Sequence, residues 1–170
     1  MSSVHWERSV PDEISGHDTL VNPDYADVFF GWVAAPTVRS PEAWARALIQ
    51  DAPLRLRVLL RVAVLVQTNL LGLRLSRRPS PDHFLGWRIA ARGDHWFRLE
   101  AASWFGVAHL VFHFDRRRVS VATFIRYDHR LSRLIWLPVS YGHRHVGLAI
   151  LRYAVSAPSL RMSPQAAWLH

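Results

Sequence analysis

Cysteine does not occur among the 170 residues. Its absence excludes a disulfide framework, a thiolate metal site and a cysteine nucleophile. The sequence also contains no charge-free apolar stretch of ~20 residues, which is the length that a membrane-spanning helix needs. The first twenty residues lack the apolar core of a secretory signal. We therefore expect no membrane insertion and a cytoplasmic location.

Lysine is absent as well, so all 21 basic residues are arginine. This bias is typical of codon usage in a high-GC genome, and the formal net charge of +8 therefore says little by itself about a partner. The arginines are scattered, with a single run at Arg116-Arg117-Arg118, where we expect a turn between two strands. We predict a solvated surface and no nucleic-acid binding. Docking of a basic surface on an anionic partner stays open as an alternative.

The sequence also lacks the patterns that hold metals and phosphates. The eight glycines are isolated, so there is no phosphate-binding loop. Among the ten histidines, His143 and His145 would point to different sides of a helix, and His109 and His113 would lie roughly 13 Å apart along a strand. None has the helical spacing of a zinc site. We predict no metal and no other cofactor.

Apolar and aromatic residues dominate what is present. Half of the residues are apolar, and eight are tryptophan and eight phenylalanine. This load argues against disorder, and a chain of this length suits one domain that buries roughly two-thirds of its unfolded surface. We expect a flexible arm over residues 1–22, a single domain over 23–156 and a tail over 157–170.

Two helices are expected after a first strand at residues 25–35. Ser40 and Pro41 are typical of a helix start and predict a helix over about 41–50. A second helix should cover about 53–71. Its apolar residues form a broad face, which we assign to core packing rather than to contact with a membrane.

From residue 84 onwards the apolar period changes to two, which predicts strands. Short connections make these strands antiparallel neighbours. With a turn at Gly93-Asp94, Arg92 lies opposite His95. The four strands cover about 85–92, 95–104, 107–115 and 118–127.

A helical period returns after Leu131 and lasts to about Ser156. One stripe of this last helix should face the sheet. It consists of Val139, His143, Val146, Ile150 and Tyr153.

Alternation assigns the strand side chains to two faces. One face holds Arg88, Arg92, His95, His109, His113, Thr123 and Tyr127. The other is more aromatic, and we therefore place it inside. It holds Trp87, Ile89, Trp96, Arg98, Glu100, Trp104, Ala108, Leu110, Phe112, Phe114, Ala122, Phe124 and Arg126.

The order of strand, two helices, four strands and a long last helix resembles the helix-grip fold of the START-like superfamily, also called SRPBCC. The residues are also similar to a bacterial family of unknown function within it. The matching pieces span about residues 24–155. They are Asp24-Tyr25-Ala26-Asp27-Val28-Phe29, the helical pair from Trp44 to Arg61, Gly106-x-Ala108-x-Leu110-x-Phe112, and Leu134-Ile135-Trp136 followed by His143. Phe105-Gly106 departs from the Pro-Gly that the family often has there, and arginine is unusually frequent after residue 128.

The resemblance implies an α+β fold in which a curved antiparallel sheet wraps around the C-terminal helix. It also implies a cavity between the two that holds an apolar molecule such as a lipid, a terpenoid or a polyketide. The superfamily includes carriers, receptors and polyketide cyclases, so the fold leaves binding and catalysis open. The family carries no agreed catalytic residues, and none is transferred here.

Four residues are candidates for chemistry in such a cavity. Arg98 and Arg126 would hold a carboxylate or an enolate, while Glu100 and His143 would move a proton. The alternatives are a structural ion pair for the three charged residues and a satisfied core histidine for His143.

Aromatic and apolar side chains are candidate walls of the cavity and equally candidates for plain core. They are Trp87, Trp96, Trp104, Leu110, Phe112 and Phe124. Tyr141 and Tyr153 are candidates for hydrogen bonds to the ligand, or for rings that pack with their hydroxyls at the rim. Our first hypothesis is a module that binds a small hydrophobic molecule. The second is a cyclase, dehydratase or isomerase of secondary metabolism that uses the same cavity, and the third is a basic interaction module. The oligomeric state stays open, a homodimer included.

Overall fold

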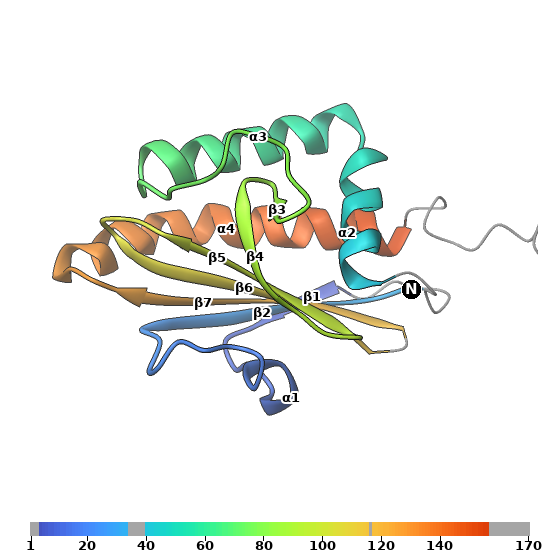
Figure 1. The fold of residues 1–170 in the computed structure, drawn as a ribbon, viewed down its shortest axis with the longest axis horizontal. Coiled ribbons are helices and arrows are strands. Elements are labelled where there is room, and N and C mark those ends of the chain that lie inside the picture. The colour runs from blue at the N-terminus through green and yellow to red at the C-terminus, as the bar shows by residue number, and fades with distance from the viewer. Residues whose placement is uncertain (1–3, 34–39, 116, 157–170) are drawn as a thin grey trace, which may run out of the picture.

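The computed structural model describes residues 4–33, 40–115 and 117–156. They form an α+β structure with one open, antiparallel sheet of seven strands (Figure 1). The spatial order of the strands is β1-β2-β7-β6-β5-β4-β3. Their bounds are β1 (Val4–Glu7), β2 (Tyr25–Trp32), β3 (His83–Phe84), β4 (Trp87–Arg92), β5 (Trp96–Ala102), β6 (Gly106–Asp115) and β7 (Arg118–Tyr127).

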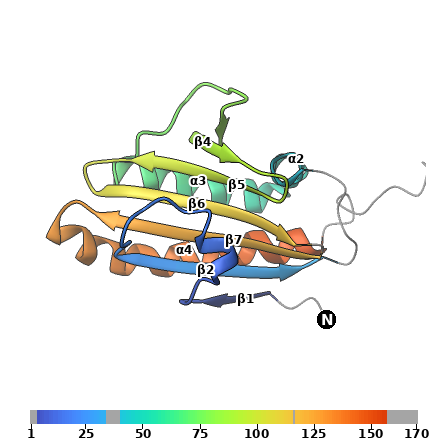
Figure 2. The ribbon, with the colours of Figure 1, turned by 60° about the horizontal axis from the view of Figure 1, so that its bottom comes forward.

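The helices within the described residues lie on both faces of this sheet. Figure 2 shows α1 on one face, while α2, α3 and α4 lie on the other. We call the surface toward α2, α3 and α4 the helix-facing surface and the opposite one the outer surface. None of these helices has the length and apolarity to cross a membrane. Their bounds are α1 (Asp12–Ser15), α2 (Pro41–Gln50), α3 (Leu54–Asn69) and α4 (Arg130–Ser156).

The predicted elements between residues 41 and 127 are observed, and their ends differ from the prediction by at most two residues. The start of α2 follows the expected chemistry, because the Ser40 hydroxyl accepts a hydrogen bond from the amide of Ala43 at 3.3 Å and Pro41 takes the first helical position. The antiparallel sheet and the long C-terminal helix are confirmed. The last part of the predicted first strand and the predicted tail lie outside the described residues.

The N-terminal segment contains two elements that the sequence did not suggest. Strand β1 pairs with β2, with Val4 opposite Gly31, and Ile14 of α1 is fully buried against the outer surface. Both elements are four residues long, too short to show a periodic pattern. Their burial comes from contacts with distant parts of the chain.

The predicted faces of β4 are wrong on one side of a β-bulge. Arg88 pairs with Glu100, but the register shifts between Ile89 and Ala91. Arg92 pairs with Phe97 and not with His95, so the predicted register of this hairpin was wrong. The extra residue turns the second half of β4 over. Arg88 therefore lies on the outer surface, whereas Arg92 lies on the helix-facing surface together with Phe97.

The predicted faces of β7 are wrong although its predicted bounds are observed, because Arg118 of the expected arginine turn already pairs within the sheet. Asp115 pairs directly with Arg118, so Leu110 lies opposite Thr123 and Phe112 opposite Val121. A shift of one residue moves every side chain of a strand to the other face. Thr123 and Tyr127 consequently belong to the helix-facing surface, and Ala122, Phe124 and Arg126 to the outer surface.

Candidate functional site

A buried carboxylate lies between the sheet and α4. Asp27 of β2 has no exposed surface, and alternation along β2 directs it, with Tyr25 and Phe29, toward α4. Its Oδ2 accepts hydrogen bonds from the Tyr25 hydroxyl at 2.5 Å and from Nε1 of Trp6 at 2.9 Å. A buried charge is tolerated only with such partners. Asp27 was not among the functional residues predicted from the sequence.

His143 of α4 brings an imidazole to this carboxylate. Its Nε2 lies 3.1 Å from Oγ1 of Thr123 and 3.5 Å from Oδ1 of Asp27. The Phe29 ring packs against the imidazole at 5.3 Å between centroids. His143 thus faces the sheet as predicted, and Thr123 and Asp27 orient its ring.

The electrostatics of the cluster favour an ionised Asp27. Burial by itself raises the pKa of this carboxyl, but the hydrogen bond and charge of His143 and the bonds from Tyr25 and Trp6 outweigh it, and the pKa lies below its usual value. Burial and the bond to Asp27 raise the pKa of the Tyr25 phenol. Tyr25 is therefore a neutral donor.

Trp136 of α4 adds an unsatisfied donor to the same region. Its side chain is buried, and its Nε1 has no hydrogen-bond partner among the described residues. The ring packs edge-on against Tyr25 at 5.2 Å and lies 5.5 Å from His143. An unpaired buried N–H costs about 1–3 kcal/mol, so an acceptor at this position would be stabilising.

The middle of the helix-facing surface is incompletely covered. Leu110, Phe112 and Val121 lie side by side on β6 and β7, because Phe112 pairs with Val121 and Leu110 lies two residues along the same strand. All three are only half-buried, although α3 and α4 lie over this surface. Apolar side chains at the centre of a sheet that packs fully against helices are normally buried.

The structure places part of the predicted site on the helix-facing surface. Trp87, Leu110, Phe112 and His143 lie between the sheet and the helices. Trp87 donates from Nε1 to Oε1 of Gln67 on α3 at 3.3 Å.

Three aromatic residues of the predicted site lie at the margins of this region. The hydroxyl of Tyr153 donates to the backbone oxygen of Asp51 at 2.5 Å, and its ring packs between α3 and α4. Tyr141 is 68 % exposed on α4, and Trp104 is 49 % exposed after the end of β5.

The other predicted site residues lie on the outer surface, and their placement in an inner cavity was wrong. Glu100 pairs with His109 and Arg98 with Val111, which places both on the face away from α4. The same pairing rule places three further residues there, namely Trp96, Phe124 and Arg126.

Arg98 and Glu100 belong to a network that holds the N-terminal segment. Nε of Arg98 donates to Glu100 at 3.1 Å, and its Nη1 donates to the backbone oxygen of His17 at 2.7 Å. Arg88 also bonds Glu100. Within the described residues, no group of three or more His, Asp or Glu side chains is placed to hold a metal ion.

A separate hollow of about 740 Å³ lies beside α2 and the loop before β3. Its lining includes three arginines, two serines and a histidine, with Leu85 as the large apolar side chain. The lining residues are Arg46, Ser76, Arg77, Arg78, Pro79, Ser80, Pro81, His83, Leu85 and Gly86.

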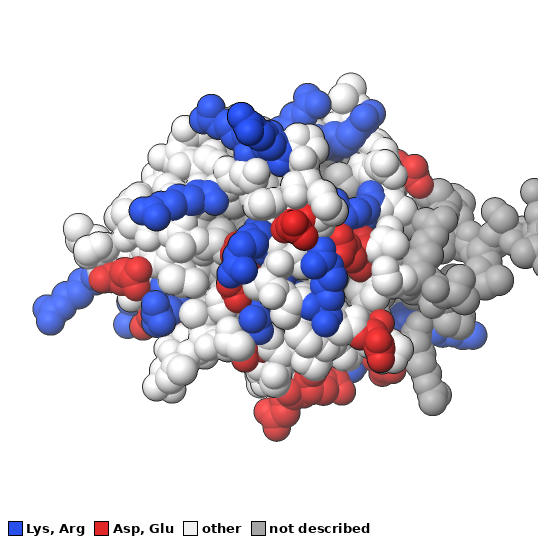
Figure 3. Space-filling view, in the orientation of Figure 1, with Lys and Arg blue, Asp and Glu red and all other residues white. Residues whose placement is uncertain are grey.

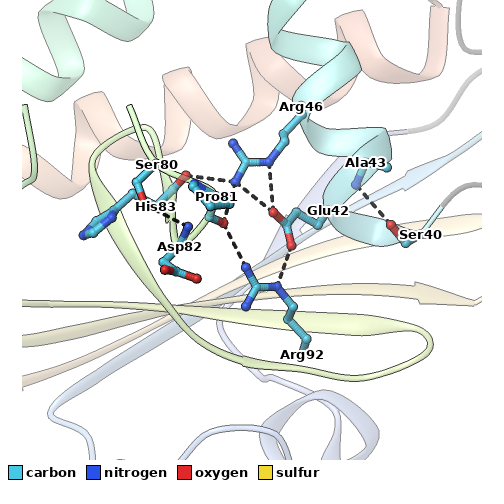
Figure 4. A network of polar contacts seen from close by, with 9 residues as sticks. All are labelled: Ser40, Glu42, Ala43, Arg46, Ser80, Pro81, Asp82, His83 and Arg92. Atoms are coloured by element: carbon cyan, nitrogen blue, oxygen red, sulfur yellow. Dashed lines mark hydrogen bonds and ion pairs between the residues drawn. The ribbon is translucent and has the colours of Figure 1, made fainter. Parts of the chain in front are cut away.

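An ion-pair network adjoins this hollow and shares Arg46 and Pro81 with its lining (Figure 4). Glu42 accepts from Nε of Arg46 at 2.9 Å and from Nε of Arg92 at 2.7 Å, and both arginines also bond the backbone oxygen of Pro81. Burial raises the pKa of Glu42, but the two arginines outweigh it and the pKa lies below its usual value. These bonds occupy donors of Arg46 and Arg92, so the network fixes α2 against β4.

The chain matches no protein-family model, no curated protein and no solved structure.

Proposed function

We propose that the chain has the helix-grip fold of the START-like superfamily and binds a small hydrophobic molecule between the sheet and α4. The observation that carries the proposal is the half-buried row of Leu110, Phe112 and Val121 beneath the helices. Apolar surface that stays accessible inside a layered fold is the usual lining of a ligand site. The order of β2, α2, α3, the meander β3 to β7 and α4 supports the fold assignment.

Polar groups at one end of this region would orient the ligand. The unpartnered Nε1 of Trp136 is a donor for a carbonyl, ester or hydroxyl oxygen. His143 lies 5.5 Å from that ring, held by Thr123 and Asp27. A ligand with a long apolar body and one oxygen-bearing end, such as a lipid, a terpenoid or a polyketide, fits this pattern of lining.

Acid–base catalysis on the same ligand is a second candidate function, and the pairing of Asp27 with His143 favours it. Because Nε2 of His143 is engaged by Thr123 and Asp27, Nδ1 is the atom that can exchange a proton with a ligand. Asp27 would orient the ring and stabilise its protonated form, as a carboxylate does for a general base. The chain would then act as a cyclase, dehydratase or isomerase.

The binding function is tested first by native mass spectrometry of the purified protein, followed by denaturing extraction of any bound molecule. Affinity is then measured by titration with the uncharged dye N-phenyl-1-naphthylamine. Val121→Phe should fill the accessible space and weaken dye binding at least tenfold. Val107→Phe is the matched control, since Val107 is half-buried on the outer surface of β6, and it should bind the dye normally.

Two results would count against a site in this place. The first is a protein that carries no small molecule and does not bind the dye. The second is equal dye affinity in both valine variants. Once a ligand has been extracted, His143→Gln separates the two candidate functions, because a carrier keeps its ligand and an enzyme loses turnover.

A further inference from the structure

Helix α3 is apolar on two opposite sides. Leu56 and Leu60 are buried and pack with α4. At 100° per residue, a second apolar row lies on the side away from them, and we call it the α3 stripe. It consists of Leu54 (69 % exposed), Val58 (48 %), Val62 (50 %) and Leu65 (58 %).

The α3 stripe exceeds what packing within the chain explains. The sequence predicted a broad apolar face on this helix for core packing, and the buried side with Leu56 and Leu60 already provides that packing. Four exposed branched side chains in a row, about 16 Å long at the rise of an α-helix, form the type of continuous apolar patch that marks an interaction surface.

The charged residues within α3 are all arginine. Arg55 lies on one edge of the row, Arg57 and Arg61 lie on the other, and all three are exposed. Neither α3 nor α4 contains an aspartate or a glutamate, although α4 has four further arginines. In Figure 3, blue atoms alternate with white ones along the upper rim, where Figure 1 places α3.

We propose that the α3 stripe docks on an anionic membrane surface, with α3 lying in the plane of the interface. The apolar row would enter the boundary between headgroups and acyl chains, and the flanking arginines would reach the lipid phosphates. Arginine suits these positions because its stem covers apolar surface while its guanidinium stays at the polar level. This inference does not depend on the proposed ligand site.

The charges favour a membrane over other partners for this face. A symmetric dimer through the stripe would bring the arginines of two copies together without any acidic residue from α3 or α4 to pair with them, and like charges oppose such contact. A nucleic-acid backbone would satisfy the arginines but would leave the apolar row uncovered. An anionic lipid surface offers an apolar acyl region for the stripe and negative phosphates for the arginines.

The absence of cysteine allows a direct test on the full chain. Val62→Cys is labelled with an environment-sensitive nitrobenzoxadiazole fluorophore and mixed with vesicles of phosphatidylcholine, with or without phosphatidylglycerol. We expect a blue shift with phosphatidylglycerol that weakens at high salt. The same label at Val21→Cys is the control, since Val21 is 74 % exposed outside the helical layer and should not shift.

Vesicle co-sedimentation of two double variants separates the electrostatic contribution of the flanking arginines from the apolar contribution of the stripe. Arg57→Gln combined with Arg61→Gln should weaken partitioning about fivefold per arginine. Val58→Ser combined with Val62→Ser should weaken it at least tenfold. Arg117→Gln, an exposed change in the β6–β7 connection, should have no effect. All sites are exposed, so unchanged far-ultraviolet circular dichroism should confirm that the variants fold.

Several results would overturn the proposal. One is the absence of a shift at Val62 with phosphatidylglycerol, and another is an equal shift with phosphatidylcholine alone. A dimer in sedimentation velocity that the double serine variant dissociates would assign the stripe to a second copy of the chain instead.

Discussion

Nδ1 of His109 lies 2.6 Å from Oδ1 of Asp18, which joins the centre of β6 to the segment between α1 and β2. Both side chains are only 5 % exposed. On its other side, Nε2 of His109 lies 3.7 Å from Oε1 of Glu100. The imidazole therefore connects two carboxylates from distant parts of the chain and fastens the N-terminal segment to the outer surface.

Loss of this contact should loosen the N-terminal segment. Asp18→Asn removes the charge that pairs with His109 inside a buried contact, and we expect the free energy of unfolding to fall by about 1–2 kcal/mol. Asp94→Asn, in the exposed turn after β4, is the matched control and should change it by less than about 0.5 kcal/mol. Urea unfolding measures both. Hydrogen exchange should also accelerate over residues 8–24 in Asp18→Asn, and unchanged exchange there would show that the contact does not hold the segment.

Two further histidines on the outer surface should make stability depend on pH. The His17 ring stacks on Trp96 at 4.2 Å and lies 5.7 Å from His113. Burial lowers the pKa of both histidines, assisted by the charge of Arg98 at His17 and by the charge of His17 at His113. A lowered folded-state pKa means that the unfolded chain takes up protons first as the pH falls.

The two histidines thus contribute fully to the free energy of unfolding above their unfolded-state pKa of about 6.5. This contribution is lost as the pH falls through their lower folded-state pKa. We expect the free energy of unfolding to decrease between pH 7 and pH 5. The double variant His17→Gln, His113→Gln should flatten this dependence. Equal slopes for the variant and the unaltered protein, from urea unfolding at each pH, would assign the effect to other groups.

Local patterns in the sequence predicted most of the elements but not all of their faces. The cap at Ser40 and the alternation of β6 are properties of neighbouring residues, and both were predicted correctly. The bulge between Ile89 and Ala91 cannot be recognised from an alternating pattern. It inverted the faces of the second half of β4, which the sequence therefore predicted wrongly. The pairing of Arg118 with Asp115, at a position expected to belong to the turn, inverted β7 in the same way.

The candidate site was only partly predictable for a related reason. His143 was found because a helical stripe directs it to the sheet, whereas Asp27 looks like an ordinary polar residue of a strand that is otherwise aromatic. Its burial depends on Trp6 and His143, which are 21 and 116 residues away. The alternation of Tyr25, Asp27 and Phe29 was the available signal, because it directs a carboxylate to the same side as two aromatic rings.

Because α4 approaches β2 closely, substitution of one glycine of α4 should destabilise the fold. A Cβ at Gly147 would lie 2.7 Å from two ring carbons of the buried Phe29. We expect Gly147→Ala to lower the free energy of unfolding by about 1–3 kcal/mol, because the added methyl group would force the buried ring or α4 to shift. Thermal and urea unfolding measure the change.

Gly142 provides the matched control on the same helix. A Cβ there would meet nothing within 4 Å, and alanine favours a helix interior by roughly 0.5–1 kcal/mol over glycine. Gly142→Ala should therefore stabilise the protein. Stabilisation by both substitutions would mean that α4 lies farther from Phe29 than the structure places it.

The carboxylate of Asp27 should matter for stability and for its dependence on acid. Asp27→Asn keeps the shape of the side chain but weakens the bonds from Tyr25, Trp6 and His143, and we expect a loss of about 2 kcal/mol at neutral pH. The folded-state pKa of Asp27 is lowered. The carboxylate therefore stabilises the fold fully above its unfolded-state pKa of about 3.9, and this stabilisation is lost as the pH falls through the folded-state pKa. Urea unfolding at pH 7 and at pH 3 should show a smaller decrease for Asp27→Asn than for the unaltered protein.

Tyr25→Phe tests whether Asp27 acts through the bonds that the structure assigns to it. The phenol is the closest partner of the carboxylate, so its removal should cost about 1–2 kcal/mol in the unaltered background. In the Asp27→Asn background the cost should be smaller, because the two residues interact directly. Strictly additive losses would mean that the two side chains are energetically independent and that the hydrogen bond between them does not contribute to stability.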